Sequence, residues 1–117
     1  MEIENGMYVR TKQGIIDKIM HIAGLNAYGT YYRLVNQTEI SFENGLVYQS
    51  DILKASHNLV DLIEVGDYVN GEKVVKCHIS YVSTLNNEVG YNNYRIKSIV
   101  TKQQFEKMQF RVGEDND

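Results

Sequence analysis

Apolar and polar residues alternate along most of this chain in short runs, which is the pattern of half-buried β-strands. Residues 8–11 alternate in this way, residues 12–14 predict a turn, and residues 15–22 form the expected return strand of a hairpin. Residues 30–35 and 46–48 predict further strands. The nine Tyr residues fit this picture, because aromatic and β-branched side chains pack well on a pleated surface. We therefore predict a mostly β protein with a small α content.

The chain also repeats a short motif. The sequence IENGMYV at positions 3–9 returns as IEVGDYV at positions 63–69, with five identities in seven positions and Gly6 matched to Gly66. In the second copy Asn70 and Gly71 favour a type I′ hairpin turn, because both residues tolerate positive φ. A second match pairs His21 with His78, which implies a shorter turn in the second copy. These matches predict an internal duplication that spans most of the chain.

Each copy is expected to end in a short helix. Ser56 predicts the cap of a helix that runs to about residue 62, and Thr101 with Gln104 forms a capping-box pattern before residues 102–108. The order of short strands, turns and a terminal helical turn resembles an SH3-like barrel. We therefore expect two tandem SH3-like β-barrel units, residues 1–62 and residues 63–112, followed by a disordered acidic tail at residues 113–117.

Composition narrows the classes of partner. Lys and Arg are scattered and outnumbered by carboxylates, and the net charge is −3, which disfavours binding to duplex nucleic acid. The single Cys77 excludes an internal disulfide bond. No apolar run approaches eighteen residues and no signal peptide is recognisable. We expect a soluble cytoplasmic protein that does not enter a membrane.

The residues that carry chemistry do not gather into a motif. Cys77 and His78 are adjacent on a predicted strand and would face opposite sides, whereas a zinc site needs about four converging ligands. The carboxylates are spread singly, and no Gly-rich phosphate loop is present. We predict no metal, no cofactor and no enzymatic activity.

Two clusters of tyrosine with arginine are the candidate binding residues. Tyr and Arg are enriched where proteins bind partners, and their side chains can also stack on bases. The alternative is that these tyrosines fill strand faces with the hydroxyl outward. The predicted binding residues are Tyr28, Tyr31, Tyr32 and Arg33 in the first unit, and Tyr91, Asn92, Asn93, Tyr94 and Arg95 in the second.

A resemblance adds a biological context. Residues 8–12, 56–71 and 96–106 resemble a group of small, mostly uncharacterised proteins from phages and prophages of low-GC Gram-positive bacteria. The similarity covers nearly the full length and carries no catalytic assignment. It implies an origin in a mobile element, and small acidic phage accessory proteins are often inhibitors of bacterial defence systems.

Three functions follow as hypotheses. The first is a non-enzymatic, phage-derived counter-defence inhibitor, similar to an anti-CRISPR protein, that occludes a host defence protein by direct contact. The second is a protein that sequesters a signalling nucleotide or small ligand, clamped by Tyr31, Tyr94, Arg33 or Arg95. The third is a structural or accessory phage protein. Units of about 60 residues bury little surface alone, so we expect the units to pack together or to form a homo-oligomer.

Overall fold

The structure is a computed structural model that describes residues 2–36, 46–110 and 112. The described chain forms two five-stranded antiparallel sheets and one α-helix, so the predicted mostly β fold is confirmed. The strands of the first sheet are β1 (Tyr8–Thr11), β2 (Ile16–Asn26), β3 (Gly29–Leu34), β4 (Leu46–Tyr48) and β5 (Ile52–Ser56). Those of the second sheet are β6 (Tyr68–Val69), β7 (Glu72–Cys77), β8 (Tyr81–Thr84), β9 (Asn87–Asn92) and β10 (Ile99–Val100). The helical elements are the 3-10 turns η2 (Gln49–Asp51) and η3 (Leu59–Leu62) and the helix α1 (Lys102–Met108).

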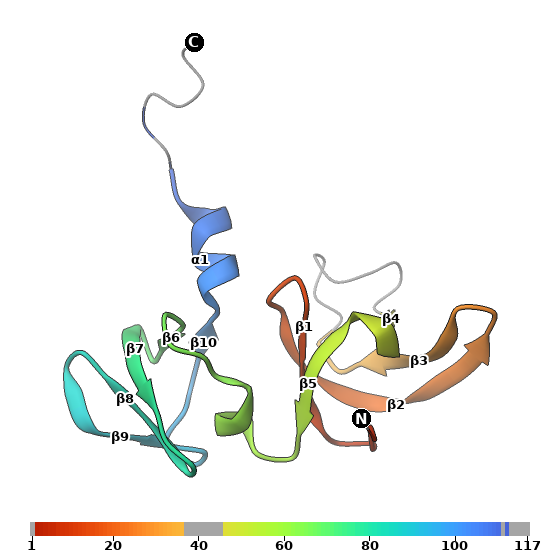
Figure 1. The fold of residues 1–117 in the computed structure, drawn as a ribbon, viewed down its shortest axis with the longest axis horizontal. Helices are drawn as coiled ribbons and strands as arrows, with labels where there is room; N and C mark the ends of the chain where they lie inside the picture. Colours follow the sequence, from red (N-terminus) through yellow and green to blue (C-terminus); the bar gives the residue numbers. More distant parts are fainter. Residues whose placement is uncertain (1, 37–45, 111, 113–117) are drawn as a thin grey trace.

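The two sheets have the same strand order. The first runs β4-β3-β2-β1-β5, and the second, read in the same direction, runs β9-β8-β7-β6-β10. The sheets lie side by side, and α1 projects away from them (Figure 1). Among the described strands, hydrogen bonding joins neither β4 to β5 nor β9 to β10. In the described residues both sheets are therefore open, and the β-barrel units that we predicted do not form closed barrels.

The repeated motif has the same backbone structure in both copies. The amide of Gly6 donates to the carbonyl oxygen of Ile19 at 3.0 Å, and the amide of Gly66 donates to that of Val74 at 3.0 Å. Both glycines have positive φ, 83° and 98°, which residues with a Cβ rarely adopt. The motif thus starts each sheet with the same glycine turn.

The register differs from the one predicted from the histidines. Because Gly6 bonds to Ile19 and Gly66 bonds to Val74, Val74 corresponds to Ile19. The pairing with the next strand shifts directly after each of these residues, between Ile19 and His21 in β2 and between Val74 and Lys76 in β7. Lys76 therefore occupies the position of His21, and the match of His21 with His78 is wrong.

The second hairpin is shorter because of its turn. Asn70 and Gly71, with φ of 53° and 80°, close it between Val69 and Glu72, which pair with each other. Positive φ at both central positions is what a type I′ turn requires, so that prediction is confirmed.

Each sheet covers a hydrophobic core of its own. The first core contains Ile3, Val9, Ile19, Tyr32, Leu34, Val47 and Ile52. The second contains Val60, Ile63, Val69, Val74 and Val82. Val60 belongs to the second core although the predicted boundary at residue 62 assigns it to the first unit. The predicted tail, residues 113–117, lies outside the described residues.

One predicted helix is confirmed and one is not. Thr101 caps α1, its side chain accepts from the amide of Gln104 at 3.2 Å, and the Gln104 side chain completes the capping box. Ser56 instead ends β5, and η3 begins after Asn58 as a short 3-10 turn. The Ser56 hydroxyl donates to Asp61 at 2.6 Å and accepts from the amide of Asn58 at 3.0 Å, so it closes a turn rather than capping a helix.

Candidate functional site

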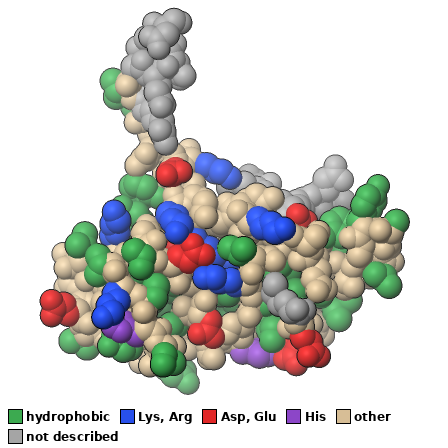
Figure 2. Space-filling view, viewed as in Figure 1, with side chains coloured by type: hydrophobic (Ala, Val, Ile, Leu, Met, Phe, Trp, Pro, Cys, Tyr) green, Lys and Arg blue, Asp and Glu red, His purple; other side chains and the backbone are tan. Residues whose placement is uncertain are grey.

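The hairpin of β2 and β3 extends beyond the first core and exposes apolar side chains. Ile19 is the last buried residue of β2, and the residues after it in the strand are exposed or half buried. Ile22 is 53% exposed, Leu25 is 76% exposed and Tyr28, in the turn, is 80% exposed. Figure 2 shows hydrophobic side chains at this end of the molecule, on the right of the view. Ile22 and Leu25 pair with Tyr32 and Thr30, so their side chains lie on the core side of the sheet, whereas Tyr31 and Tyr48 pair with each other on the opposite side. We call the set Met20, Ile22, Leu25, Tyr28, Tyr31 and Tyr48, which covers both faces of the hairpin, the hairpin surface.

Three tyrosine rings gather on the face of the hairpin opposite to Ile22 and Leu25. The ring of Tyr48 lies 6.1 Å from that of Tyr28, edge to face, and 5.6 Å from that of Tyr31. The Tyr48 hydroxyl accepts from the side-chain amide of Asn26 at 3.0 Å. Gly24 makes room for Tyr31, because a Cβ there would lie 2.5 Å from the Tyr31 hydroxyl oxygen. The cluster thus combines a residue of the β2–β3 turn with residues of β3 and β4.

The other two predicted residues of the first unit lie elsewhere. Tyr32 alternates with Tyr31 and points into the core, where it is 3% exposed. Its hydroxyl donates to the side chain of Gln49 at 3.1 Å, and burial raises the pKa of the phenol. Arg33 pairs with His21 in the register of β3 with β2. Tyr32 therefore has the packing role that the alternative interpretation gave to these tyrosines.

The predicted residues of the second unit fasten β9 and the segment after it. The Tyr91 hydroxyl donates to the carboxylate of Glu72, and the Arg95 guanidinium lies 5.6 Å from the centre of the Tyr91 ring. Hydrogen bonds from Tyr91, and then from Thr84, hold the pKa of Glu72 below its usual range. Tyr91 and Arg95 are thus engaged with each other and with the second sheet.

Asparagine side chains shape the loop after β9. Asn93 Oδ1 accepts from the amide of Val60 at 2.8 Å, which ties the loop to η3. Asn92 Oδ1 accepts from the amide of Tyr94 at 3.1 Å, and the Tyr94 side chain is 90% exposed. The structure therefore does not bring the two predicted clusters into one site, since Tyr28 and Tyr31 belong to the hairpin surface of the other sheet.

Sequence reasoning missed most of the hairpin surface. Met20, Ile22, Leu25 and Tyr48 were not among the predicted residues. A signal was present, because no Asp, Glu, Lys or Arg occurs from residue 19 to residue 32, although such residues make up 23% of the chain. A charge-free stretch that is longer than the core can cover predicts exposed apolar surface.

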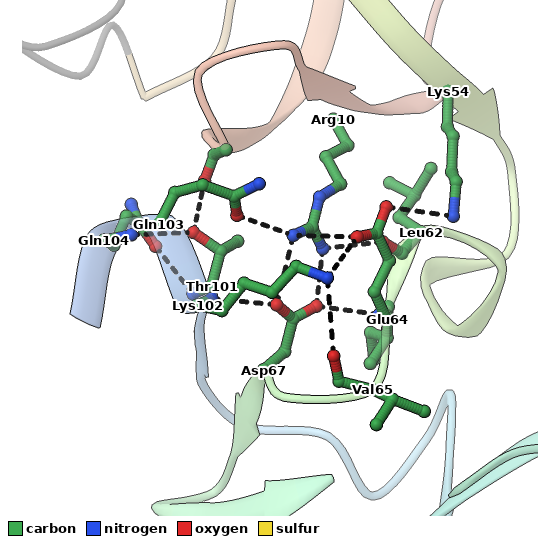
Figure 3. A network of polar contacts seen from close by, with 12 residues as sticks. Arg10, Lys54, Leu62, Glu64, Val65, Asp67, Thr101, Lys102, Gln103 and Gln104 are labelled. Atoms are coloured by element: carbon green, nitrogen blue, oxygen red, sulfur yellow. Dashed lines mark hydrogen bonds and ion pairs between the residues drawn. The ribbon is translucent and has the colours of Figure 1, made fainter. Parts of the chain in front are cut away.

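A buried ion pair joins the two sheets. Arg10 of β1 and Asp67, which precedes β6, have fully buried side chains and form a two-pronged contact, with Nη2 donating to Oδ1 at 3.1 Å (Figure 3). Arg10 Nη1 also donates to the Leu62 carbonyl oxygen at 3.0 Å, and Nη2 donates to the Gln103 side chain at 2.9 Å. Arg10 thus contacts η3, the start of β6 and α1 together.

Further polar contacts surround this pair. Asp67 accepts from the backbone amides of Glu64 at 2.8 Å and Lys102 at 2.9 Å. The Glu64 carboxylate lies 2.9 Å from the Lys102 ammonium and 3.2 Å from that of Lys54, which belongs to β5 (Figure 3). Burial raises the pKa of Glu64, but the hydrogen bond from Lys102 and the charges of Arg10 and Lys54 outweigh it and hold that pKa below its usual range. The set thus connects β1 and β5 of the first sheet to Glu64, Asp67 and α1.

One pairing of side chains has the residue types of a nucleophile and base. His78 Nε2 lies 2.9 Å from Ser83 Oγ, and the Ser83 hydroxyl donates its proton to the Glu88 carbonyl oxygen at 3.0 Å. In this arrangement the imidazole donates to the hydroxyl oxygen, which is the reverse of activation by a base. Desolvation, followed by the charge of Asp67, raises the pKa of the Cys77 thiol, which disfavours the reactive thiolate.

Within residues 2–36, 46–110 and 112, no three His, Cys, Asp or Glu side chains gather as metal ligands would. The helices of the same part of the chain are too short or too polar to cross a membrane. Comparison with known proteins finds no match to a protein-family model, a curated protein or a solved structure.

Proposed function

We propose that the protein is a non-enzymatic binding protein that occludes a partner protein through the hairpin surface. The observation that carries the proposal is the outer half of the β2–β3 hairpin, where Ile22, Leu25 and Tyr28 are more than half exposed. Large exposed apolar patches mark interaction sites, and the centres of protein interfaces are depleted in charge and enriched in Tyr and Met. The charge-free stretch from residue 19 to residue 32 has this composition.

The partner in this proposal is a host defence protein, such as a CRISPR nuclease or another immune effector. This part rests on the resemblance to phage and prophage proteins and on the acidic balance of the chain. Occlusion requires no catalytic residues, and a rigid aromatic cluster supplies contact area at low entropic cost. Tyr28, Tyr31 and Tyr48 contact one another in such a cluster.

The proposed fold history is an internal duplication of one SH3-like unit. The same strand order in both sheets supports it, as does the matched glycine turn of Gly6 and Gly66. The β2–β3 hairpin is then the place where the first unit has departed most, since β2 has 11 residues and β7 has 6. On this view a shared framework carries a binding element in one unit only.

The experiment combines phage plating with direct binding. The chain is expressed in a host whose immune system restricts a phage, and the purified effector is titrated against the purified protein. We expect the double variant Ile22→Ser and Leu25→Ser to weaken binding by about 10-fold or more, because residues in the centre of an interface contribute most of the affinity. The unchanged protein should restore phage plating on this host, and the double variant should not.

The matched control lies in the second half of the chain, at Ile79 in the turn between β7 and β8 and at Val89 in β9. Ile79→Ser with Val89→Ser removes two strongly exposed apolar side chains, 96% and 81% exposed, far along the chain from the hairpin surface. This variant should bind and protect as the unchanged protein does. Equal loss in both double variants, or full activity of the hairpin variant, would contradict the proposal, as would the absence of any effect of the protein on plating.

A further inference from the structure

A cavity between the two sheets has the features of a small-molecule site. One hollow of about 210 Å³ is lined by Tyr8, Lys18 and Leu59 on the first side and by Ile96, Lys97 and Ser98 on the other. A second hollow of about 310 Å³ shares Tyr8, Leu59 and Ile96 with it and ends at Tyr94. Ligand pockets commonly measure about 300–1,000 Å³, so the adjoining hollows have room for a small ligand.

A buried carboxylate in the cavity wall has an unsatisfied oxygen. Asp17 is 3% exposed and lines the first hollow. Its Oδ1 accepts from the amide of Lys18 at 2.7 Å and from both the backbone and side-chain amides of Asn36 at 3.1 Å. Its Oδ2 is buried and receives no hydrogen bond from any described residue. A buried acceptor without a donor costs about 1–3 kcal/mol. Because Oδ2 has almost no accessible surface, an N–H group in the cavity reaches it only when the Asp17 side chain turns toward the cavity.

Two ammonium groups give the cavity a net positive charge. Lys18 and Lys97 line the first hollow together with Asp17, and neither lysine forms an ion pair with a described residue. The Lys18 ammonium lies 5.5 Å from the centre of the Tyr8 ring. Two cations against one carboxylate favour a ligand that carries negative charge. The Ser98 hydroxyl beside Lys97 adds a donor for an anionic group.

The remaining walls are flat and apolar. Ile16 and Ile99 line the first hollow, Leu59 and Ile96 line both, and the rings of Tyr8 and Tyr94 border the second. From the cavity, the oxygen of Asp17 and the two lysines we infer that this site binds a nucleotide. In this proposal the base lies between the apolar walls, the Asp17 side chain turns toward the cavity and accepts an N–H of the base on Oδ2, and the phosphate binds Lys97, Ser98 and Lys18.

This site differs from the one that the sequence suggested for a nucleotide. Of the residues predicted to clamp such a ligand, only Tyr94 lines either hollow. Tyr31 belongs to the hairpin surface, and Arg95 lies against the ring of Tyr91. The site is also separate from the proposed protein-binding surface, so each can be tested without the other.

Calorimetric titration and thermal shift with nucleoside 5′-monophosphates test the inference on the full chain. A ligand that binds only the folded state raises Tm by mass action. We expect Lys97→Ala to weaken binding by about 10-fold, as the loss of one charge-assisted contact does. Lys76→Ala, an exposed lysine of β7 that lines neither hollow, is the matched control and should bind as the unchanged protein does.

Asp17→Asn gives the sharper test. The new side-chain amide would keep an oxygen that accepts from the amides of Lys18 and Asn36. It would replace the acceptor Oδ2 by an NH₂ group, so that two donors would face each other. We expect about 10-fold weaker binding or more. The Tm of the variant without nucleotide should fall somewhat, because the three hydrogen bonds to Oδ1 lose the charge of the carboxylate, and the nucleotide-induced shift is measured relative to that value. The inference is overturned if no nucleotide binds, if the nucleoside or inorganic phosphate alone binds as well as the nucleotide, or if Asp17→Asn and Lys97→Ala bind normally. The hairpin variant Ile22→Ser with Leu25→Ser should bind nucleotide normally, whichever result the plating experiment gives.

Discussion

The junction between the sheets and the outer half of the β2–β3 hairpin reverse the usual distribution of side chains. At the junction Arg10 and Asp67 are charged and fully buried. At the hairpin Ile22, Leu25 and Tyr28 are apolar or aromatic and mostly exposed. Burial of charge is costly unless every group is paired, whereas exposure of apolar surface costs little unless it causes association.

The buried charges at the junction determine how the two sheets are oriented, whereas the exposed side chains of the hairpin can contact another molecule. An apolar junction would tolerate sliding of one sheet on the other, but the Arg10 guanidinium has one orientation in which it meets Asp67, Leu62 and Gln103 together. At the hairpin Ile22, Leu25 and Tyr28 are more than half exposed, and these side chains remain available to another molecule. Variants of the two regions should therefore differ in which property they change.

The largest effect is expected at the junction. Arg10→Met should lower the free energy of unfolding by about 3–5 kcal/mol, because it leaves the buried Asp67 carboxylate without its cation. Urea unfolding followed by circular dichroism measures the loss. Arg95→Met, at an exposed arginine that contacts a single ring, should cost less than about 1 kcal/mol. Equal stability of the two variants would mean that the junction does not hold the sheets together.

An intermediate effect is expected from pH. The pKa of Glu64 is lowered in the folded protein, so its contribution to stability is present above its ordinary pKa of about 4.3 and disappears as pH falls through the lower folded value. Glu64→Gln should cost about 1 kcal/mol at pH 7, the usual size for a partly exposed carboxylate with two ammonium partners. Its stability should also fall less steeply between about pH 5 and pH 3 than that of the unchanged protein. If the free energy of unfolding of the two proteins has the same pH dependence, the ionised Glu64 carboxylate does not contribute to stability.

The smallest effect on stability is expected at the hairpin. Ile22→Ser with Leu25→Ser should change the free energy of unfolding by less than about 1 kcal/mol, because neither side chain is in the core. Thermal and urea unfolding measure this. Ile19→Ala, in the buried half of the same strand, should cost about 2–5 kcal/mol and shows that the assay detects loss of packing. A large loss in the double variant would make the hairpin surface part of the fold rather than a binding surface.

The sequence predicted local structure well where a short motif determines the backbone. The Asn70 and Gly71 turn and the capping box of Thr101 with Gln104 were both correct, because turn and cap geometry depend on a few adjacent residues. Ser56 was misassigned because its immediate neighbours do not decide what its hydroxyl does. Its hydroxyl can cap a helix or close a turn, and the choice depends on Asp61 and the 3-10 turn that follows.

The site was harder to predict because its parts meet only through tertiary structure. Tyr48 reaches Tyr28 and Tyr31 through the pairing of β4 with β3, and nothing in its sequence neighbourhood indicates this. Arg10 and Asp67 lie in different halves of the chain, so their ion pair has no local signature. Register also depends on turn length, and for this reason the two histidines that looked equivalent are not.

The ion pair at the junction links the substitutions that residues 10 and 67 can accept. In the matched glycine turns the position of Asp67 corresponds to Met7, and one step past the matched Val9 and Val69 the position of Arg10 corresponds to Asn70. Each half therefore carries one charge that only the other half neutralises. If recombination exchanged one half for that of a chain lacking the matching charge, an unpaired charge would remain buried in the interior. Residues 10 and 67 should therefore change together in related chains that keep this arrangement.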